Sequence, residues 1–137
     1  MSIEDLTGLE HAVNLEVFNL SKNQISNISP LSGLASLEWL NLYGNQISDL
    51  SPLSDLTNLE WLHLHGNQIP DLSPLSGLTN LEYLDIRFNY IDITPGSPAM
   101  IINNNLIAKG ATVCYEPQNE LESFSVLLSI TSRVVSY

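Results

Sequence analysis

The sequence has very few basic residues. Its 137 residues include only four Lys and Arg against fifteen Asp and Glu, which gives a formal net charge of -11 at pH 7. Proteins that hold nucleic acid do so through clustered Lys and Arg. The scarcity of basic residues argues against a nucleic-acid partner, while the acidity is only a weak signal for a partner with a basic surface.

Cysteine and long apolar runs are scarce as well. The single cysteine, Cys114, excludes an internal disulfide, so nothing marks the chain as a disulfide-stapled secreted domain. No apolar run reaches the roughly 18 residues that a membrane helix needs, and we expect no membrane insertion. The opening Met-Ser-Ile-Glu-Asp shows no signal peptide. The compartment is therefore open: cytoplasmic as the chain is read, and secreted or on the cell surface if it is a piece of a larger protein.

Residue patterns typical of catalysis are missing. The sequence contains no Gly-rich phosphate loop, no Ser-His-Asp order and no Cys-His pair. Acid and base catalysis by carboxylates needs two of them in different environments within a cleft. Repeated, equivalent Glu residues do not provide such a pair. We predict that the protein is not an enzyme and has no cofactor.

What the sequence does contain is one pattern repeated with a period of 22 residues. Copies begin at Leu15, Leu37 and Leu59, and a fourth copy, which soon departs from the pattern, begins at Leu81. A fixed period of about 20 to 50 residues predicts a solenoid, in which each coil buries its apolar side against its neighbours. Residues 1–14 match only the rear half of a copy. We therefore expect an incomplete first coil, in a chain that is a fragment or a truncated product.

The first half of each copy predicts a short strand. With the first Leu of a copy as position 1, positions 1, 4 and 6 are apolar and positions 3 to 7 alternate. This alternation turns positions 4 and 6 toward the core and positions 3, 5 and 7 away from it. Position 9 is always Asn, whose amide can bond backbone groups that a tight turn leaves unpaired. We expect a ladder of Asn23, Asn45, Asn67 and Asn89.

The second half of each copy predicts a tight helical turn. Ser29-Pro30, Ser51-Pro52 and Ser73-Pro74 each supply an N-cap residue followed by Pro at the first helical position. Two Leu residues that are three apart follow each Ser-Pro pair. One turn of 3-10 or α-helix therefore presses both Leu side chains onto the core.

The repeats end in a different pattern. Ser97-Pro98 begins a longer helix over 99–109, with Ile102 and Leu106 on one face and Asn103 to Asn105 largely off it. Gly110 is a natural stop for this helix, and residues 111–116 then predict a last strand.

We expect three parts in the chain: repeats over 1–96, a helix and strand over 97–117, and a tail of unknown structure over 118–137. The segment from Phe124 to Ile130 in the tail is strand-prone. Self-association of chains through an edge strand is one possible consequence.

The repeated pattern Leu-x-x-Leu-x-Leu-x-x-Asn-x-Ile, with its 22-residue period, resembles the leucine-rich repeat. The stretch Asn-Gln-Ile-Ser-Asp-Leu-Ser-Pro-Leu-Ser-Asp-Leu-Thr-Asn-Leu is similar to the bacterial internalin and SDS22-like class. The resemblance implies an α/β solenoid. Its curved, right-handed stack would have a concave parallel β-sheet, short 3-10 or helical turns on the convex side, and a C-terminal helix-strand cap of the bacterial type. The resemblance also implies repeats that bind other proteins and carry no catalytic chemistry.

Positions 3, 5 and 7 differ between copies and project from the predicted concave sheet. Position 3 gives a column of rings that the core does not need, stacked about 4.8 Å apart, as in a protein-binding hot spot. We predict that another protein binds there. The predicted contact residues are Trp39, Trp61, Tyr83, Tyr43, His63, His65, Asp85 and Arg87.

Three other interpretations of the ring column stay open. Neighbouring rings can simply cover one another and stabilise the sheet. Flat rings also stack on sugars, which would make the column a carbohydrate-binding surface. The repeats can instead be a structural spacer within a larger protein.

Two further groups of side chains carry possible ligands. His63, His65 and Asp85 have a spacing that could present ligands to zinc, but a structural zinc site needs four ligands and we find no convincing fourth. We predict no metal site. Position 2 is Glu in every copy, and we interpret this column as a solvated rim, with a strip that attracts a basic partner or a divalent ion as the alternative. The column consists of Glu16, Glu38, Glu60 and Glu82.

Overall fold

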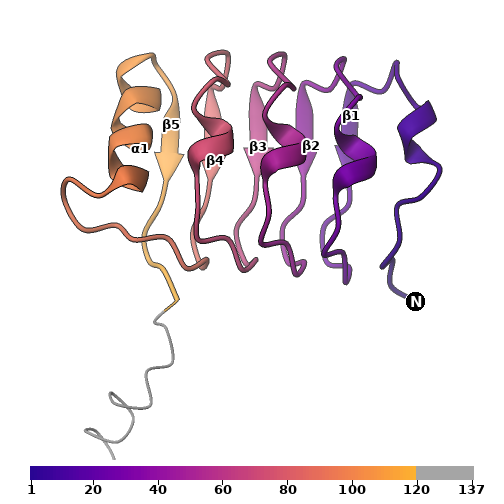
Figure 1. The fold of residues 1–137 in the computed structure, drawn as a ribbon, viewed down its shortest axis with the longest axis horizontal. Coiled ribbons are helices and arrows are strands. Elements are labelled where there is room, and N and C mark those ends of the chain that lie inside the picture. The colour runs from indigo at the N-terminus through magenta and orange to yellow at the C-terminus, as the bar shows by residue number, and fades with distance from the viewer. Residues whose placement is uncertain (120–137) are drawn as a thin grey trace, which may run out of the picture.

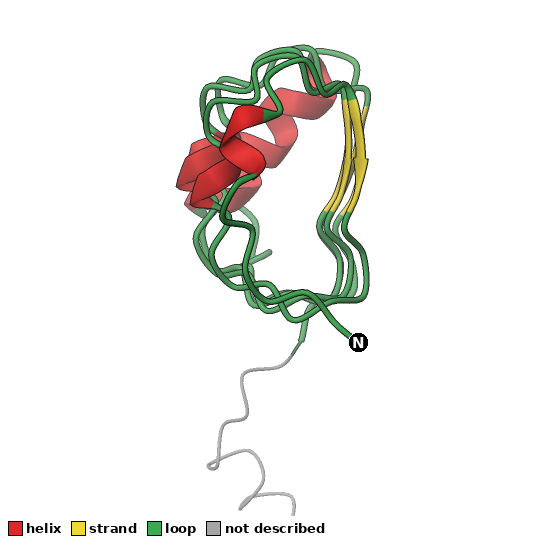
Figure 2. Cartoon of the chain, turned by 90° about the vertical axis from the view of Figure 1, so that its right-hand side faces the viewer, coloured by secondary structure: helices red, strands yellow, loops and turns green. Residues whose placement is uncertain are grey.

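The computed structural model describes residues 1–119, which form a stack of coils (Figure 1). One side of the stack is a five-stranded parallel sheet whose strands follow the order of the sequence. The strands are β1 (Val17–Asn19), β2 (Trp39–Asn41), β3 (Trp61–His63), β4 (Tyr83–Asp85) and β5 (Thr112–Cys114). The helical elements are η1 (Leu9–His11), η2 (Ser29–Leu31), η3 (Ser51–Leu53), η4 (Ser73–Leu75) and α1 (Pro98–Ala108). A view along the stack shows the strands on one side of each coil and the helical turns opposite them (Figure 2).

The pairing of the strands confirms the predicted register. Val17 faces Trp39, Trp39 faces Trp61 and Trp61 faces Tyr83, so equal positions of successive copies lie side by side. The regular strands are shorter than predicted, because they cover only positions 3 to 5. Hydrogen bonds between coils nevertheless continue to position 8, where the Gly44 amide donates to the His65 carbonyl at 3.0 Å.

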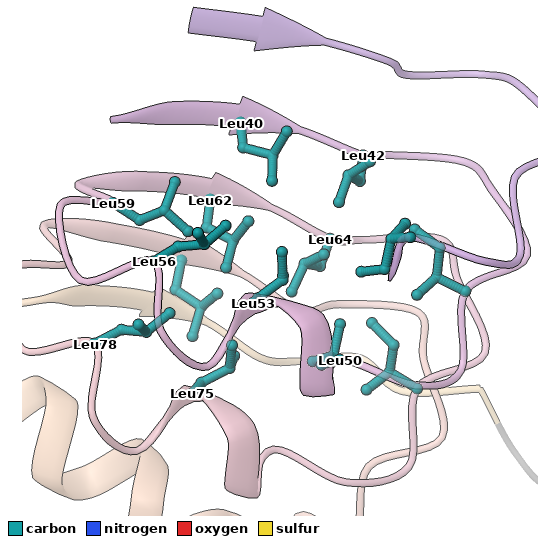
Figure 3. Packing of buried hydrophobic residues seen from close by; sticks show 14 of the residues in the cluster. Leu40, Leu42, Leu50, Leu53, Leu56, Leu59, Leu62, Leu64, Leu75 and Leu78 are labelled. Carbon is teal, nitrogen blue, oxygen red and sulfur yellow. The ribbon is translucent and has the colours of Figure 1, made fainter. Parts of the chain in front are cut away.

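The core fills the space between the sheet and the helical turns (Figure 3). Leu side chains from position 4 in the strands and position 6 just after them meet Leu side chains from the turns, and the central ones have no exposed surface. They include Leu40, Leu42, Leu53, Leu62, Leu64 and Leu75, each with 0% exposure. Burial of one such side chain contributes about 1.5 to 3 kcal/mol, and chain entropy offsets most of the sum. Contacts between neighbouring coils therefore decide the stability of the stack.

The prediction that Ser caps the helical turns is wrong for η2, η3 and η4. In each of them Ser is already the first helical residue. The residue before it is the N-cap, and its side chain makes no capping hydrogen bond. An Asn or Asp two residues before each Ser accepts from the Ser backbone amide at 2.9 Å instead. Such Asx turns satisfy a donor that the start of a helix leaves open. The acceptors are Asn27, Asp49 and Asp71.

The helix α1 begins and ends as predicted. Ser97 is its N-cap, and the Ser97 hydroxyl accepts from the Met100 amide at 3.2 Å. Gly110, with φ of +108°, follows the helix. The Gly110 amide donates to Ile107 and the Ala111 amide to Leu106, the two bonds of a Schellman motif. The helix packs against β5 and η4, and β5 extends the sheet beyond β4. The role of α1 and β5 together as a terminal cap stays a prediction.

The prediction that Asn103 lies largely off the apolar face of this helix is wrong. Asn103 is fully buried and shares a face with Ala99 and Leu106, as residues four and three apart on a helix do. Its Nδ2 lies 3.6 Å from the Met100 sulfur, and its Oδ1 has no hydrogen-bond partner. Because Asn is a polar residue, the sequence pattern did not indicate that residue 103 is buried in the core.

The Asn residues at position 9 tie the coils together. Asn67 Nδ2 donates to the carbonyls of Leu42 and Leu64, both at 3.0 Å, and Oδ1 accepts from the Ile47 amide at 3.0 Å. Two of these three partners belong to the preceding coil. Asn45 and Asn89 repeat all three kinds of bond, and Asn23 repeats two of them.

Gln118 continues this ladder, although the sequence assigned it to the tail. Its Oε1 accepts from the Ile91 amide at 3.2 Å, and its Nε2 donates to the carbonyls of Ile86 and Tyr115 at 2.9 and 2.6 Å. These are the same three kinds of bond that Asn67 makes. The segment from Phe124 to Ile130, which the sequence associates with self-association, lies outside the described residues. Within residues 1–119, no helix is long and apolar enough to cross a membrane.

Candidate functional site

The side chains at positions 3, 5 and 7 of the four coils share one surface, which we call the sheet face. The strand register sets them in three rows across the strands. The first row is Val17, Trp39, Trp61 and Tyr83, the second is Asn19, Asn41, His63 and Asp85, and the third is Ser21, Tyr43, His65 and Arg87. All eight predicted contact residues therefore lie on this surface.

Four rings form a cluster at the centre of the sheet face, which we call the aromatic cluster: Trp39, Trp61, His63 and Tyr83. Trp61 stacks on Tyr83 with ring centroids 5.1 Å apart and planes at 28°. His63 fills the next row, with its ring 5.5 Å from Trp39 and 5.1 Å from Tyr83. The rings cover one another in part, yet Trp61 keeps 41% of its surface exposed. The rings of the cluster are thus packed against one another, while the upper side of the cluster, which faces away from the sheet, stays exposed to solvent.

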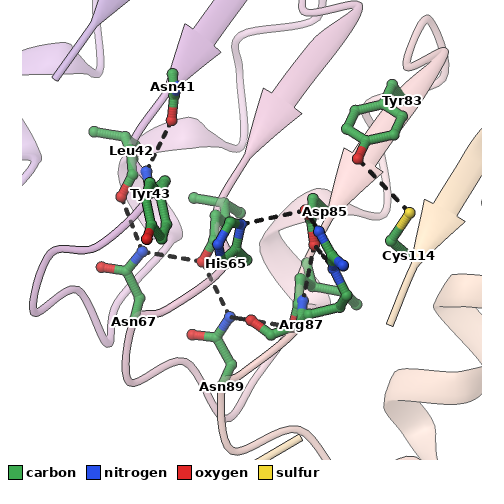
Figure 4. Close-up of polar contacts among 12 residues, drawn as sticks. Asn41, Leu42, Tyr43, His65, Asn67, Tyr83, Asp85, Arg87, Asn89 and Cys114 are labelled. Atoms are coloured by element: carbon green, nitrogen blue, oxygen red, sulfur yellow. Dashed lines mark hydrogen bonds and ion pairs between the residues drawn. The ribbon is translucent and has the colours of Figure 1, made fainter. Parts of the chain in front are cut away.

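More rings lie beyond the carboxyl ends of the strands, in and beside the third row. Tyr43 packs on His65 with ring centroids 3.9 Å apart (Figure 4). Lys22 Nζ lies 5.7 Å from the Tyr43 ring centroid. Phe88 extends this row at 6.4 Å from His65 and is 42% exposed. Phe88 and Lys22 were not among the predicted contact residues. Both residues occupy position 8 of their copies and have φ near +60°. The two middle copies have Gly at this position, so a large side chain in place of Gly is the sequence signal that could have identified Lys22 and Phe88.

Asp85, Arg87 and His65 form a charged group at one end of the sheet face (Figure 4). Asp85 accepts two bonds from the Arg87 guanidinium, from Nε at 2.9 Å and from Nη2 at 2.7 Å. His65 Nδ1 lies 3.3 Å from the same carboxylate, but it is not aligned for a hydrogen bond. Asp85 is only 2% exposed. The Asp85 carboxylate therefore lies against Arg87 and His65 with almost no exposed surface, and its role as a contact residue stays a prediction.

The titration behaviour of this group follows from burial and pairing. Burial pushes the pKa of Asp85 upward, but the hydrogen bonds from Arg87 and the charges of His65 and Arg87 outweigh it and hold that pKa below its usual value. The same pairing raises the pKa of Arg87. Asp85 and Arg87 are thus a fixed ion pair at neutral pH.

His63 and Tyr83 stay uncharged near neutral pH. Burial lowers the pKa of His63, against the opposing effect of Asp85. Burial raises the pKa of Tyr83 to about 12. The Cys114 thiol lies beside the Tyr83 hydroxyl, with its sulfur 3.7 Å from the hydroxyl oxygen. The aromatic cluster therefore presents neutral rings.

Side chains that could hold a metal do not converge in the described part of the chain. No group of three or more His, Cys, Asp and Glu residues within 1–119 has the arrangement of a metal site. The carboxylate of Asp85, which the sequence placed beside His63 and His65, is occupied by Arg87.

The Glu residues of position 2 line one side of the sheet face. The backbone amides of Glu38, Glu60 and Glu82 each donate to the carbonyl of the preceding Glu of the column at 2.8 Å. Glu60 is half-buried and the other three are exposed. No basic side chain of residues 1–119 forms an ion pair with any of them.

One parallel strand and one 3-10 turn per 22-residue coil, joined by an Asn ladder, define a leucine-rich-repeat solenoid. The family model for leucine-rich repeats in two copies matches residues 13–55 and 57–96, more than half of the chain. The chain belongs to the leucine-rich repeat family.

Solved structures place it with internalin-like proteins. The internalin inlF of Listeria monocytogenes is 29% identical, with a TM-score of 0.76 over 92% of this chain and 36% of its own length. The internalin inlC2 of the same species is 30% identical, with a TM-score of 0.67 over 96% of this chain and 64% of its own. A leucine-rich-repeat protein of Leptospira interrogans is 27% identical, with a TM-score of 0.69 over 82% of this chain and 28% of its own. The chain thus spans only part of each of these proteins. No curated protein sequence matches it significantly.

Proposed function

We propose that the protein is a non-catalytic interaction module that binds another protein on its sheet face. Domains of this family generally bind other proteins and are typically not enzymes. The choice of face rests on the aromatic cluster and on the row of Tyr43, His65 and Phe88 beside it. Binding hot spots are enriched in Trp and Tyr at the centre of an interface.

The exposed upper side of the aromatic cluster is the observation that carries this proposal. Trp61 has a large apolar surface in water, and its ring stacks on Tyr83 of the next coil, which in turn contacts His63. The core does not need these rings, because positions 4 and 6 already fill it. A rigid platform of rings loses little conformational entropy when a partner covers it. Arg87, fixed by Asp85, adds a preorganised donor group at one end.

The test compares two variants of the full chain in affinity capture from the native organism. The double variant Trp39→Ala and Trp61→Ala removes the centre of the cluster, and we expect at least about a hundredfold weaker binding of the captured protein. The control is Tyr90→Ala, which removes a similarly exposed ring outside the sheet face. Circular dichroism checks that both variants keep the fold.

Unchanged binding of the double variant would show that the sheet face is the wrong surface. A glycan array probed with the unmodified chain and the two variants tests the carbohydrate interpretation. If a glycan binds, and the double variant loses it while the Tyr90 control retains it, the ligand is a sugar rather than a protein.

A further inference from the structure

We infer that the partner presents arginine side chains to a strip along one side of the sheet face. The strip, which we call the acidic-aromatic strip, consists of Glu16, Glu38, Glu60 and Glu82 at position 2 and Trp39, Trp61 and Tyr83 at position 3. The inference rests on the proposed function, since it assigns the partner's chemistry at that same face. It concerns charge and ring chemistry together, because three of the four carboxylates, Glu38, Glu60 and Glu82, are followed directly by a ring.

The backbone fixes the alternation of carboxylates and rings. The carbonyl of Glu16 accepts from the amides of both Glu38 and Trp39, at 2.8 and 3.0 Å, and the carbonyl of Glu38 does the same for Glu60 and Trp61. Each Glu-ring pair is thereby held one strand away from the next, about 4.8 Å along the sheet. The strip is therefore a regular ladder.

The negative charge of the strip is not balanced within the described chain. Glu16, Glu38, Glu60 and Glu82 form no ion pairs among residues 1–119. The two basic side chains on or beside the sheet face are engaged elsewhere, Arg87 with Asp85 and Lys22 over the Tyr43 ring. With a net charge of -11 for the whole chain, an acidic partner would be repelled and a basic one attracted.

The rings decide which cation fits. An arginine guanidinium is planar and weakly hydrated, so it stacks on an aromatic face while it donates to a neighbouring carboxylate. Glu60 and Trp61 are adjacent residues on the same strip, and Trp61 is the more exposed of the two tryptophans. An exposed carboxylate alone stays solvated, and a ring alone accepts any apolar group. Their combination selects a cationic side chain with a flat surface.

The experiment uses two synthetic peptides of equal length on the full chain, one alternating Arg and Gly and one with neutral citrulline at every Arg. The readout is intrinsic fluorescence, because the two tryptophans of the chain, Trp39 and Trp61, both belong to the strip. We expect a saturable change with the Arg peptide that weakens as salt is added, and no saturation with the citrulline peptide. The variant Glu38→Gln with Glu60→Gln should bind the Arg peptide about tenfold more weakly.

A control variant separates local charge from net charge. Glu4→Gln with Asp55→Asn removes the same two charges at exposed residues outside the strip, and it should bind within about twofold of the unmodified chain. Equal binding of both peptides, equal weakening in both double variants, or no response to the Arg peptide would overturn the inference. The proposed function has a separate test. If the captured partner is lost on Trp39→Ala and Trp61→Ala but is unaffected by Glu38→Gln and Glu60→Gln, only the inference fails.

Discussion

The inward and outward positions of the strands obey different rules. Inward positions 4 and 6 are Leu in both middle coils and are fully buried. Outward positions 3, 5 and 7 change from coil to coil, and all of them except the buried Asp85 keep exposed surface, as Trp61 does. The hydrophobic core is filled without the side chains at the outward positions. The repeated residues therefore make the coil, and the residues that vary carry what distinguishes this protein from any other stack of the same coil.

The largest expected effect is at an inward position. Leu62→Ala leaves a cavity at a fully buried site in β3, and we expect a loss of about 2 to 5 kcal/mol in the free energy of unfolding. Trp61→Ala, one residue away on the outward side, should cost less than about 1 kcal/mol, as surface changes usually do. Urea denaturation measures both. Similar losses in the two variants would contradict the division between the faces.

The Asn ladder should come next in effect. Asn67→Ala leaves the Leu42 and Leu64 carbonyls and the Ile47 amide without their partner, at a cost of about 1 to 3 kcal/mol. Asn41→Ala is the matched control. The side chain of Asn41 on the sheet face accepts only from the Tyr43 amide. A smaller loss for Asn67→Ala than for Asn41→Ala would show that the ladder does not join the coils.

The ion pair between Asp85 and Arg87 predicts a dependence of stability on pH. The folded-state pKa of Asp85 is lowered, so its stabilising contribution is complete above the unfolded pKa of about 3.9 and is lost as the pH falls through the folded value. The difference in the free energy of unfolding between the unmodified chain and Asp85→Asn should therefore be constant from about pH 5 to 7 and shrink below about pH 4. Denaturation curves across this range check it. A difference that grows on acidification would contradict the pairing with Arg87.

The smallest expected effect is at Lys22, which is position 8 of the copy that begins at Leu15. Lys22 has φ of +59°, a left-handed conformation that costs a side-chain-bearing residue about 1 kcal/mol, whereas Gly44 and Gly66 adopt it freely. Lys22→Gly and Lys22→Ala both lose the contact with Tyr43, and only the former relieves the backbone. We expect the Gly variant to unfold at a higher urea concentration, with a difference of about 1 kcal/mol. An Ala variant that is equally stable would show that the strain is absent.

The sequence predicts the register and the ring column because both follow from repetition. Once a 22-residue period is recognised, Trp39, Trp61 and Tyr83 must share a row, whatever the details of the turns. Features that do not repeat were harder to predict. Gln118 makes the bonds of a ladder Asn outside the repeats, with a longer side chain, so its residue type gave no signal.

Other differences come from competition between local groups. Asn27, Asp49 and Asp71 each bond the Ser amide that begins the next turn, so the Ser side chains are not needed as caps. Asn103 is polar and yet buried, because tertiary packing overrides its preference. Asp85 lies in an outward row but is covered by Arg87 and His65, which a pattern of alternation cannot reveal.

The most direct test of the account is an NMR titration of the full chain with its captured partner, which follows the indole Nε1–H signals of Trp39 and Trp61. If the outward positions carry the function, these two signals should be among the most strongly shifted, while amide signals from α1 and from η2 to η4 stay in place. A partner that shifts the helical side and leaves both indole signals unchanged would contradict the assignment of binding to the sheet face.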